Sequence, residues 1–177
     1  DVQVDDARLT LANLQDAEAR GARILPRTRL QTATRQDDHW VVTLQSSDGQ
    51  IETLRCRAIV NACGPWAGRV REAIGGTGRT DLKLVRGSHI VVPRLYDGDH
   101  AYTLQNDDGR IVFLIPFHGS HTLIGTTEVA MTDPDQRPEA SPEEIDYLCR
   151  AANRYLHTPI DGADVAWHFA GVRPLLD

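Results

Sequence analysis

The most apolar part of the sequence lies between residues 110 and 128. Residues 111–115 and 122–124 form two runs rich in β-branched and aromatic side chains, separated by a Pro, His and Gly cluster. Such runs, divided by turn residues, predict a β-hairpin at the centre of a sheet. Because the first run does not alternate with polar residues, it favours a strand covered on both faces, although a short buried helix gives the same pattern.

Before this hairpin the pattern predicts an α/β portion. Apolar residues at helical spacing begin after Asp5 and stop before Gly21, which indicates an amphipathic helix over residues 7–20. Alternating segments then predict a three-stranded meander, and Pro65 suits the first turn of a helix over residues 66–74. The predicted strands are residues 22–25, 27–35, 39–45, 51–56 and 58–62.

From residue 81 onward the pattern changes to β. Short turns join the segments, which is typical of a mainly antiparallel sheet. The order Ser141-Pro142-Glu143-Glu144 is a capping box, and one apolar stripe follows it, so residues 142–156 are expected to form a helix across this sheet. The predicted strands are residues 82–86, 90–92, 101–105, 111–115, 121–125 and 165–170.

Composition excludes several classes of protein. The chain has 177 residues, 41% of them hydrophobic, and a formal net charge of −6. It is large enough for one domain or two small ones, and it lacks the basic stripe of a nucleic-acid binder. Its three cysteines show no metal-ligand spacing, and neither do its histidines, so we expect no metal and reduced thiols in a cytoplasmic setting. No apolar run is long enough to cross a membrane.

Two stretches have the form of ligand sites. Residues 60–66 join a strand to a helix through Cys63 and Gly64, a corner that suits a phosphate or cofactor, although an ordinary βα turn has the same form. Cys63 has a further interpretation as a nucleophile at a helix N-terminus, but no partner is identifiable. Arg173 is held beside Pro174, where a guanidinium suits a phosphate or carboxylate; a salt-bridged arginine is the alternative.

Three other residues have polar side chains next to predicted strands. His89 is either a base or hydrogen-bond donor, or a half-buried histidine without a role in chemistry. Thr126 and Thr127, which follow Gly125, either offer hydroxyls to a ligand or end the strand.

Five ordered blocks of the sequence resemble one enzyme family. They are Asp5-Asp6-Ala7-Arg8-Leu9, Val60-Asn61-Ala62-Cys63-Gly64-Pro65-Trp66, Gly87-Ser88-His89-Ile90-Val91-Val92-Pro93, Ile124-Gly125-Thr126-Thr127-Glu128 and Gly171-Val172-Arg173-Pro174-Leu175. Together they resemble the FAD-dependent, respiratory glycerol-3-phosphate dehydrogenases, within a wider group of flavoproteins similar to D-amino-acid oxidase. The resemblance covers essentially the whole chain. Cys63 stands where the family usually has Thr.

The resemblance implies a fold and an activity. It implies a partial FAD-binding domain over residues 1–78 and an antiparallel-sheet substrate domain with its covering helix over residues 79–177. The implied reaction oxidises sn-glycerol 3-phosphate to dihydroxyacetone phosphate. Hydride passes from C2 to the flavin, and electrons leave to a membrane quinone. The implied location is cytoplasmic, with the parent enzyme on the inner face of the cell membrane, and a homodimer is possible.

The resemblance also implies site residues. Arg173 would hold the substrate at its phosphate or its reacting oxygen, and His89, Thr126 and Thr127 lie on matching motifs with less defined roles. The implied cofactor-binding residues are Leu30, Asn61, Ala62, Cys63 and Gly64.

Besides the difference at Cys63, the sequence lacks two features of the family, one of them being the later basic residues of the substrate pocket. It has no N-terminal Gly-x-Gly-x-x-Gly, the motif that binds the FAD pyrophosphate, and it starts without Met. We therefore expect the middle part of a longer enzyme, which alone is inactive and binds FAD weakly or not at all. Two alternatives remain: a related flavin oxidase of amines or hydroxy acids, and a non-catalytic binding or dimerisation module whose exposed strand edges pair between copies.

Overall fold

The computed structural model describes residues 4–76 and 82–176, and within them the chain forms two compact units. The first unit runs to Ala62 and includes the segment that begins at Arg69. The second contains Cys63–Gly68 and the chain after the gap in the description. The predicted boundary near residues 75–80 lies mostly outside the described residues.

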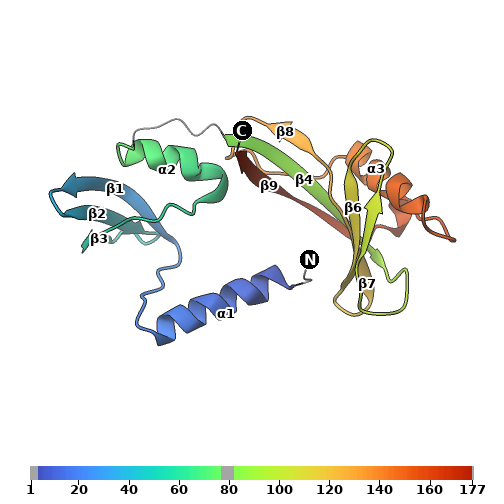
Figure 1. The fold of residues 1–177 in the computed structure, drawn as a ribbon, viewed down its shortest axis with the longest axis horizontal. Coiled ribbons are helices and arrows are strands. Elements are labelled where there is room, and N and C mark those ends of the chain that lie inside the picture. The colour runs from blue at the N-terminus through green and yellow to red at the C-terminus, as the bar shows by residue number, and fades with distance from the viewer. Residues whose placement is uncertain (1–3, 77–81, 177) are drawn as a thin grey trace. The chain divides into compact units, whose positions relative to one another are not determined.

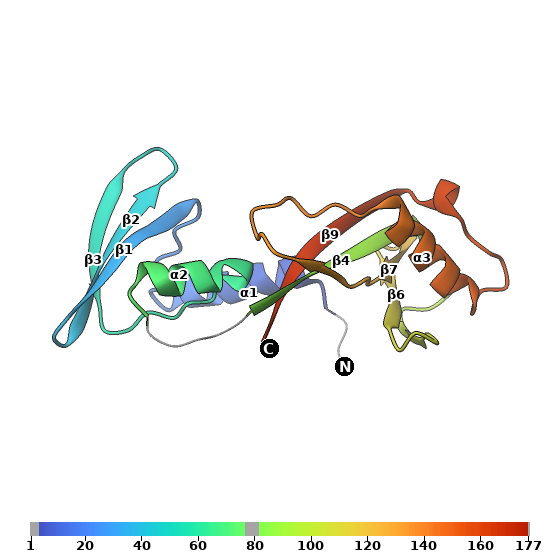
Figure 2. The same ribbon diagram turned by 90° about the horizontal axis from the view of Figure 1, so that it is seen from above.

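The first unit contains the predicted helix and meander. Helix α1 (Asp6–Ala19) begins at Asp5, whose side chain accepts a hydrogen bond from the backbone N–H of Arg8 at 3.0 Å. None of its residues is buried. Strands β1 (Thr28–Gln36), β2 (His39–Ser46) and β3 (Ile51–Cys56) form an antiparallel sheet in the order β1-β2-β3, which confirms the predicted meander (Figure 2).

Two strands predicted for this unit are wrong. Residues 22–25 and 58–62 are irregular, and Val60 is 90% exposed. A single extended segment leaves its N–H and C=O groups without bonds, so an apolar run becomes a strand only where a neighbouring strand is present. Residues 58–62 lead instead to the short 3-10 helix η1 (Gly64–Trp66) and helix α2 (Ala67–Ala73), which confirms the helix predicted after Pro65.

The second unit is built on a six-stranded antiparallel sheet. Its strands are β4 (Leu82–Pro93), β5 (Tyr102–Gln105), β6 (Ile111–Phe117), β7 (His121–Gly125), β8 (Val129–Met131) and β9 (Trp167–Leu176). The order is β5-β6-β7-β4-β8, and β9 pairs with β4 (Figure 1). The predicted hairpin is confirmed as β6–β7, with Leu114 opposite Ile124, and both strands lie inside the sheet.

Strand β4 organises this sheet. The pattern predicted two strands, interrupted at Gly87-Ser88-His89, but the structure has one continuous strand of 12 residues. Strand β9 pairs with β4 from Leu82 to Val91 along one edge, so β7 and β8 share the other edge. Because β9 carries the hydrogen bonding past Gly87, the glycine does not end the strand.

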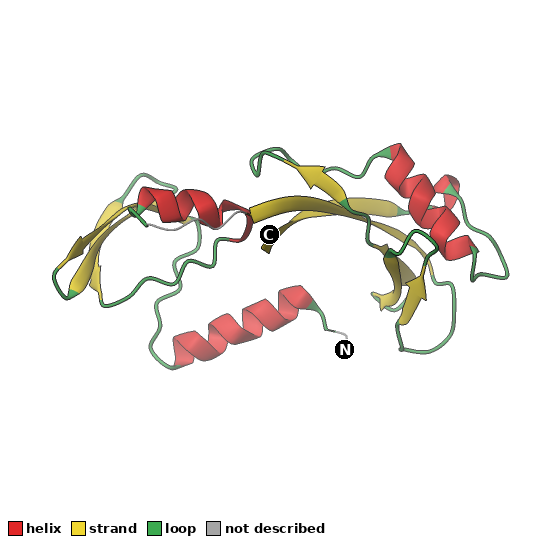
Figure 3. Cartoon of the chain, turned by 45° about the horizontal axis from the view of Figure 1, so that its top comes forward, coloured by secondary structure: helices red, strands yellow, loops and turns green. Residues whose placement is uncertain are grey.

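Helix α3 (Pro142–Asn153) covers one face of the sheet (Figure 3). The predicted capping box is present: the Ser141 hydroxyl accepts from the backbone N–H of Glu144, and the Glu144 carboxylate accepts from the backbone N–H of Ser141. The core between helix and sheet is fully buried at its centre. It comprises Ile90, Val92, Leu104, Val112, Leu114, Ile124, Leu148, Cys149, Ala151, Ala152 and Ile160.

The opposite face of the sheet is only partly covered. On β6, Val112 and Leu114 are buried against α3, whereas Phe113 and Ile115 remain half-exposed. The expectation that residues 111–115 are covered on both faces is confirmed for the face toward α3, whereas the other face is only partly covered within the described residues. The candidate site lies on this partly covered face, opposite α3.

None of the helices in residues 4–76 and 82–176 has both the length and the apolar composition required to span a bilayer.

Candidate active site

A short loop leaves the sheet at the middle of β4. Strand β7 ends at Gly125 and β8 begins at Val129, so the residues between them pass Gly87 and Ser88. The backbone N–H of Ser88 donates to the Thr127 hydroxyl at 2.9 Å, and the Thr127 N–H donates to the Ser88 carbonyl at 3.4 Å. This pair of bonds fixes the loop to the strand.

Arg173 reaches this loop from β9. Its backbone pairs with Val85, and its Nη2 atom donates to the Thr127 carbonyl at 3.1 Å and lies 3.5 Å from the Glu128 carboxylate. A Cβ atom at Gly87 would overlap the Thr126 hydroxyl and lie 3.4 Å from Arg173 Nη2. The glycine therefore leaves room for both side chains, each of which donates to the Thr127 carbonyl.

His89 lies two residues beyond Gly87, on the same face. Its ring stacks on Phe169 with centroids 5.1 Å apart and an interplanar angle of 10°, and its Nδ1 atom is buried without a hydrogen-bond partner in the described part of the chain. Burial lowers the pKa of the imidazole, and the positive charge of Arg173 lowers it further. His89 is therefore neutral at neutral pH.

Aromatic side chains continue from His89 across this face. Trp167 lies 5.9 Å from Phe169 and 5.5 Å from Phe117, measured between ring centroids. Trp167 and Phe169 come from β9 and are exposed, and Phe117 comes from β6. The face opposite α3 thus presents an arginine and a histidine beside an aromatic surface.

On the other face, a buried carboxylate binds the same loop. Glu144 accepts hydrogen bonds from the Thr127 hydroxyl at 2.6 Å, the Ser88 hydroxyl at 2.8 Å and the Arg86 guanidinium at 2.7 Å, besides the N–H of Ser141. Burial alone would raise the pKa of Glu144, but these donors and the charge of Arg86 lower it below its ordinary value. The carboxylate is ionised and fully engaged.

In this network the Thr127 hydroxyl binds protein groups, which differs from the role expected from the sequence. The sequence pattern made its hydroxyl a candidate for substrate binding, but the residue is 1% exposed and its hydroxyl bonds to Ser88 and Glu144. Thr126, in contrast, is half-buried and lies beside Arg173. Within the described residues, Thr127 fixes the loop.

The predicted cofactor residues lie in two places. Leu30 is half-buried on β1, next to an irregularity in the pairing with β2. Asn61 and Ala62 are the last residues before the second unit, which begins with Cys63 and Gly64. Cys63 is exposed, and Gly64 has a φ of +52°, a conformation that glycine adopts without strain.

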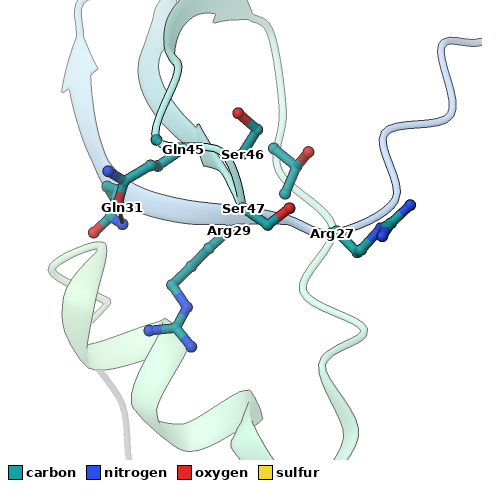
Figure 4. Close-up of a pocket in the computed structure, with 8 residues that line it drawn as sticks. Arg27, Arg29, Gln31, Gln45, Ser46 and Ser47 are labelled. Atoms are coloured by element: carbon teal, nitrogen blue, oxygen red, sulfur yellow. Dashed lines mark hydrogen bonds between the residues drawn. The ribbon is translucent and has the colours of Figure 1, made fainter.

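A polar pocket lies in the first unit. It encloses about 580 Å³ beside β1 and β2 and is lined by polar side chains, among them Arg27, Arg29 and Gln45 (Figure 4). Arg29 and Gln31, which flank Leu30, line it, but Leu30 does not. No group of three His, Cys, Asp or Glu residues in the described ranges is arranged to hold a metal ion.

Of the four candidates His89, Thr126, Thr127 and Arg173, the first two and Arg173 lie close to one another, whereas the Thr127 hydroxyl bonds to Ser88 and Glu144. Sequence reasoning missed Glu144 and Arg86 as parts of the site. The signal for Glu144 was its place in the capping box, which identified a local role but not its bonds to β4 and the loop.

The second unit is an antiparallel sheet with a helix on one face and an arginine and a histidine on the other. A family model described as "DAO: FAD dependent oxidoreductase" matches residues 1–177. The chain belongs to this family of FAD-dependent oxidoreductases.

Individual relatives give more detail. The chain is 42% identical to a glycerol-3-phosphate dehydrogenase of Pseudomonas aeruginosa and to a D-erythritol 1-phosphate dehydrogenase of Brucella abortus, in both cases over 100% of its own length. It covers 35% and 36% of those proteins, so it spans about a third of the length of the curated relatives that it matches.

A solved structure agrees with these relatives. The structure of a Bacillus halodurans glycerol-3-phosphate dehydrogenase complexed with FAD matches with a TM-score of 0.86 and 32% identity, over 99% of this chain and 36% of that one.

Proposed function

We propose that this chain supplies the substrate-binding part of an FAD-dependent dehydrogenase that oxidises sn-glycerol 3-phosphate to dihydroxyacetone phosphate. The observation that carries the proposal is that Arg173 on β9 and His89 on β4 lie on one face of the sheet, near enough for the charge of Arg173 to lower the pKa of His89. A guanidinium binds phosphate or a developing oxyanion, and a neutral imidazole accepts a proton. The names of the relatives support the choice of substrate.

The reaction divides into two transfers. Oxidation of the secondary alcohol removes a hydride from C2 and a proton from its hydroxyl group, which leaves a ketone. FAD, when bound, supplies the acceptor for the hydride and its two electrons. His89 takes the hydroxyl proton, because its lowered pKa keeps the ring neutral. Arg173 binds the phosphate or the reacting oxygen, and Thr126 lies beside it as a second substrate contact.

The residues present fit a flavin in part. Leu30, Asn61, Ala62, Cys63 and Gly64 would line it, as the resemblance implies. His89 Nδ1 and Arg173 Nε are buried polar atoms that no described residue satisfies, and they lie on the face that bears the aromatic side chains. Because the pyrophosphate motif is not in this sequence, the chain alone is expected to bind FAD weakly or not at all.

D-Erythritol 1-phosphate is a second candidate substrate, because the dehydrogenase named for it is as similar to this chain as the glycerol-3-phosphate enzyme. Both compounds are polyol phosphates, so the Arg173 guanidinium can bind the phosphate group of either. Comparing kcat/KM for the two compounds in the full-length enzyme decides between them.

The remaining partners rest on the resemblance. The electrons pass to a quinone, and the parent enzyme lies on the inner face of the cell membrane. Activity with a soluble quinone analogue and co-sedimentation with lipid vesicles test these two points. The third proposed partner is a second copy of the protein. Edge strands such as β5 have one edge without a neighbouring strand in the described sheet, where a second copy can pair. A monomeric mass by light scattering at all concentrations contradicts it.

The central experiment is anaerobic mixing of the full-length protein with sn-glycerol 3-phosphate. We expect the flavin absorbance near ~450 nm to bleach as the cofactor is reduced, and glycerol without phosphate to leave it unchanged. If amines, amino acids or hydroxy acids bleach it and polyol phosphates do not, the related-oxidase alternative is correct.

A further inference from the structure

Arg173 does not hold its position through β9 alone. The guanidinium donates to the carbonyl oxygen of Thr127, a residue in the loop between β7 and β8. A flexible arginine side chain binds a ligand well only if its own orientation is restricted. The position of the Thr127 carbonyl is therefore part of what orients Arg173.

The Thr127 carbonyl is positioned from the opposite side of the sheet. The hydroxyl of the same residue donates to Glu144 at 2.6 Å and accepts from the Ser88 N–H at 2.9 Å. Thr127 and Ser88 are 1% and 0% exposed, and Glu144 is 7% exposed. These three residues are thus shielded from water, where hydrogen bonds to a charged group are strong, whereas the Arg173 side chain is 40% exposed.

Glu144 is itself held by two elements. Its place at the third position of α3 sets its backbone, and Arg86 and Ser88 on β4 bind its two carboxylate oxygens. A local capping role needs only the N–H of Ser141. The three side-chain bonds to the loop and to β4 exceed that requirement.

We propose that Glu144 is a positioning residue for Arg173: through Thr127 it sets the guanidinium in the orientation that binds substrate. This inference rests on the proposed function, since it assigns Arg173 to the substrate. Glu144 touches neither substrate nor cofactor. Its effect on catalysis passes through one hydrogen bond, from Arg173 Nη2 to the Thr127 carbonyl.

The test is Glu144→Gln in the full-length enzyme, measured per bound flavin. The amide keeps the size of the side chain but accepts at only one oxygen, so the contacts of Thr127, Ser88 and Arg86 cannot all be retained. We expect kcat/KM for glycerol 3-phosphate to fall about 10- to 100-fold, because small misplacements of a binding group cost this much. The relative changes in kcat and KM caused by Glu144→Gln should match those caused by Arg173→Lys.

The matched control is Glu143→Gln, which makes the same change one residue earlier, on the exposed side of α3. It should leave kcat/KM within about twofold of the parent, as a surface change does. Ser88→Ala is the milder variant, since it removes one donor to Glu144 and leaves Arg86 in place. It should show a smaller loss with the same division, and it serves where Glu144→Gln does not fold.

A double-mutant cycle separates the outcomes. If Glu144 acts through Arg173, adding Glu144→Gln to Arg173→Lys costs little more than Arg173→Lys alone. A lower Tm with unchanged kcat/KM in Glu144→Gln, or fully additive losses, overturns the positioning role. If Arg173→Lys itself has no effect, the proposed function fails instead, so the two failures are distinguishable.

Discussion

The imidazole ring of His89 occupies the space into which a Cβ atom on Gly125 would project. The two residues face each other across the β4–β7 ladder. On its other side the ring stacks on Phe169 of β9. The histidine is thus confined between a glycine and an aromatic ring, and its position depends on the absence of a side chain at residue 125.

Gly125→Ala is therefore expected to displace the His89 ring. The added methyl group overlaps the ring, and relief requires a new side-chain conformation or a shift of the strand, at a cost of about 1–3 kcal/mol in the free energy of unfolding. Urea unfolding of this chain measures the cost. Gly162→Ala, where no atom lies within 4 Å of the new Cβ, is the control and should be near neutral. Equal stabilities of the two variants contradict this account.

Arg173→Lys should lower kcat/KM about 10- to 100-fold in the full-length enzyme, because a lysine cannot reproduce the planar fork of a guanidinium. The division of the loss identifies the group that is bound. A rise in KM alone indicates the substrate phosphate, whereas a fall in kcat indicates the reacting oxygen. Unchanged kinetics contradict the role of Arg173. Arg137→Lys, an exposed arginine on a loop, is the control.

Removing the charge of Arg173 should raise the pKa of His89. Burial is the larger cause of its lowered pKa and persists in Arg173→Gln, so we expect a partial return toward the ordinary value of 6.5. NMR titration of the histidine ring protons measures it, with His89→Gln to assign the signal. A pKa that stays unchanged in Arg173→Gln shows that the two side chains do not interact.

The same lowered pKa has a consequence for stability. Between the native pKa and about 6.5, the unfolded chain binds a proton at His89 that the folded chain does not, so this histidine favours unfolding as the pH falls through that range. Above 6.5 both states are neutral there and the effect disappears. His89→Gln should flatten this part of the curve of unfolding free energy against pH.

The Glu144 carboxylate should produce a second pH dependence, at lower pH. Its native pKa lies below the ordinary value of 4.5, so its stabilising contribution is complete above 4.5 and is lost as the pH falls through the native pKa. Urea unfolding between pH 7 and pH 3 should show the largest loss in the parent chain and the smallest in Glu144→Gln, because other carboxylates with a lowered pKa, such as Glu52 and Asp108, titrate in all three proteins. The same slope in all three proteins contradicts the assignment to Glu144.

Local sequence was sufficient where the stabilising contacts are themselves local. The capping box at Ser141 and Glu144 is made within one helical turn, and α3 begins where the sequence predicts. The β6–β7 hairpin pairs neighbours in the chain, so turn residues and two apolar runs were enough. The meander β1–β3 follows for the same reason.

Distant contacts decided the rest. Residues 58–62 have the composition of a strand but form no ladder with a described strand. Gly87 does not interrupt β4 because β9 pairs across it. The sequence determined which polar residues were candidates: His89, Thr126 and Arg173. Only the tertiary structure decided that these residues share one face of the sheet. It also decided that Glu144 binds the β7–β8 loop from the opposite face. The reason is that the hydrogen bonds involved join strands and a helix far apart in the chain.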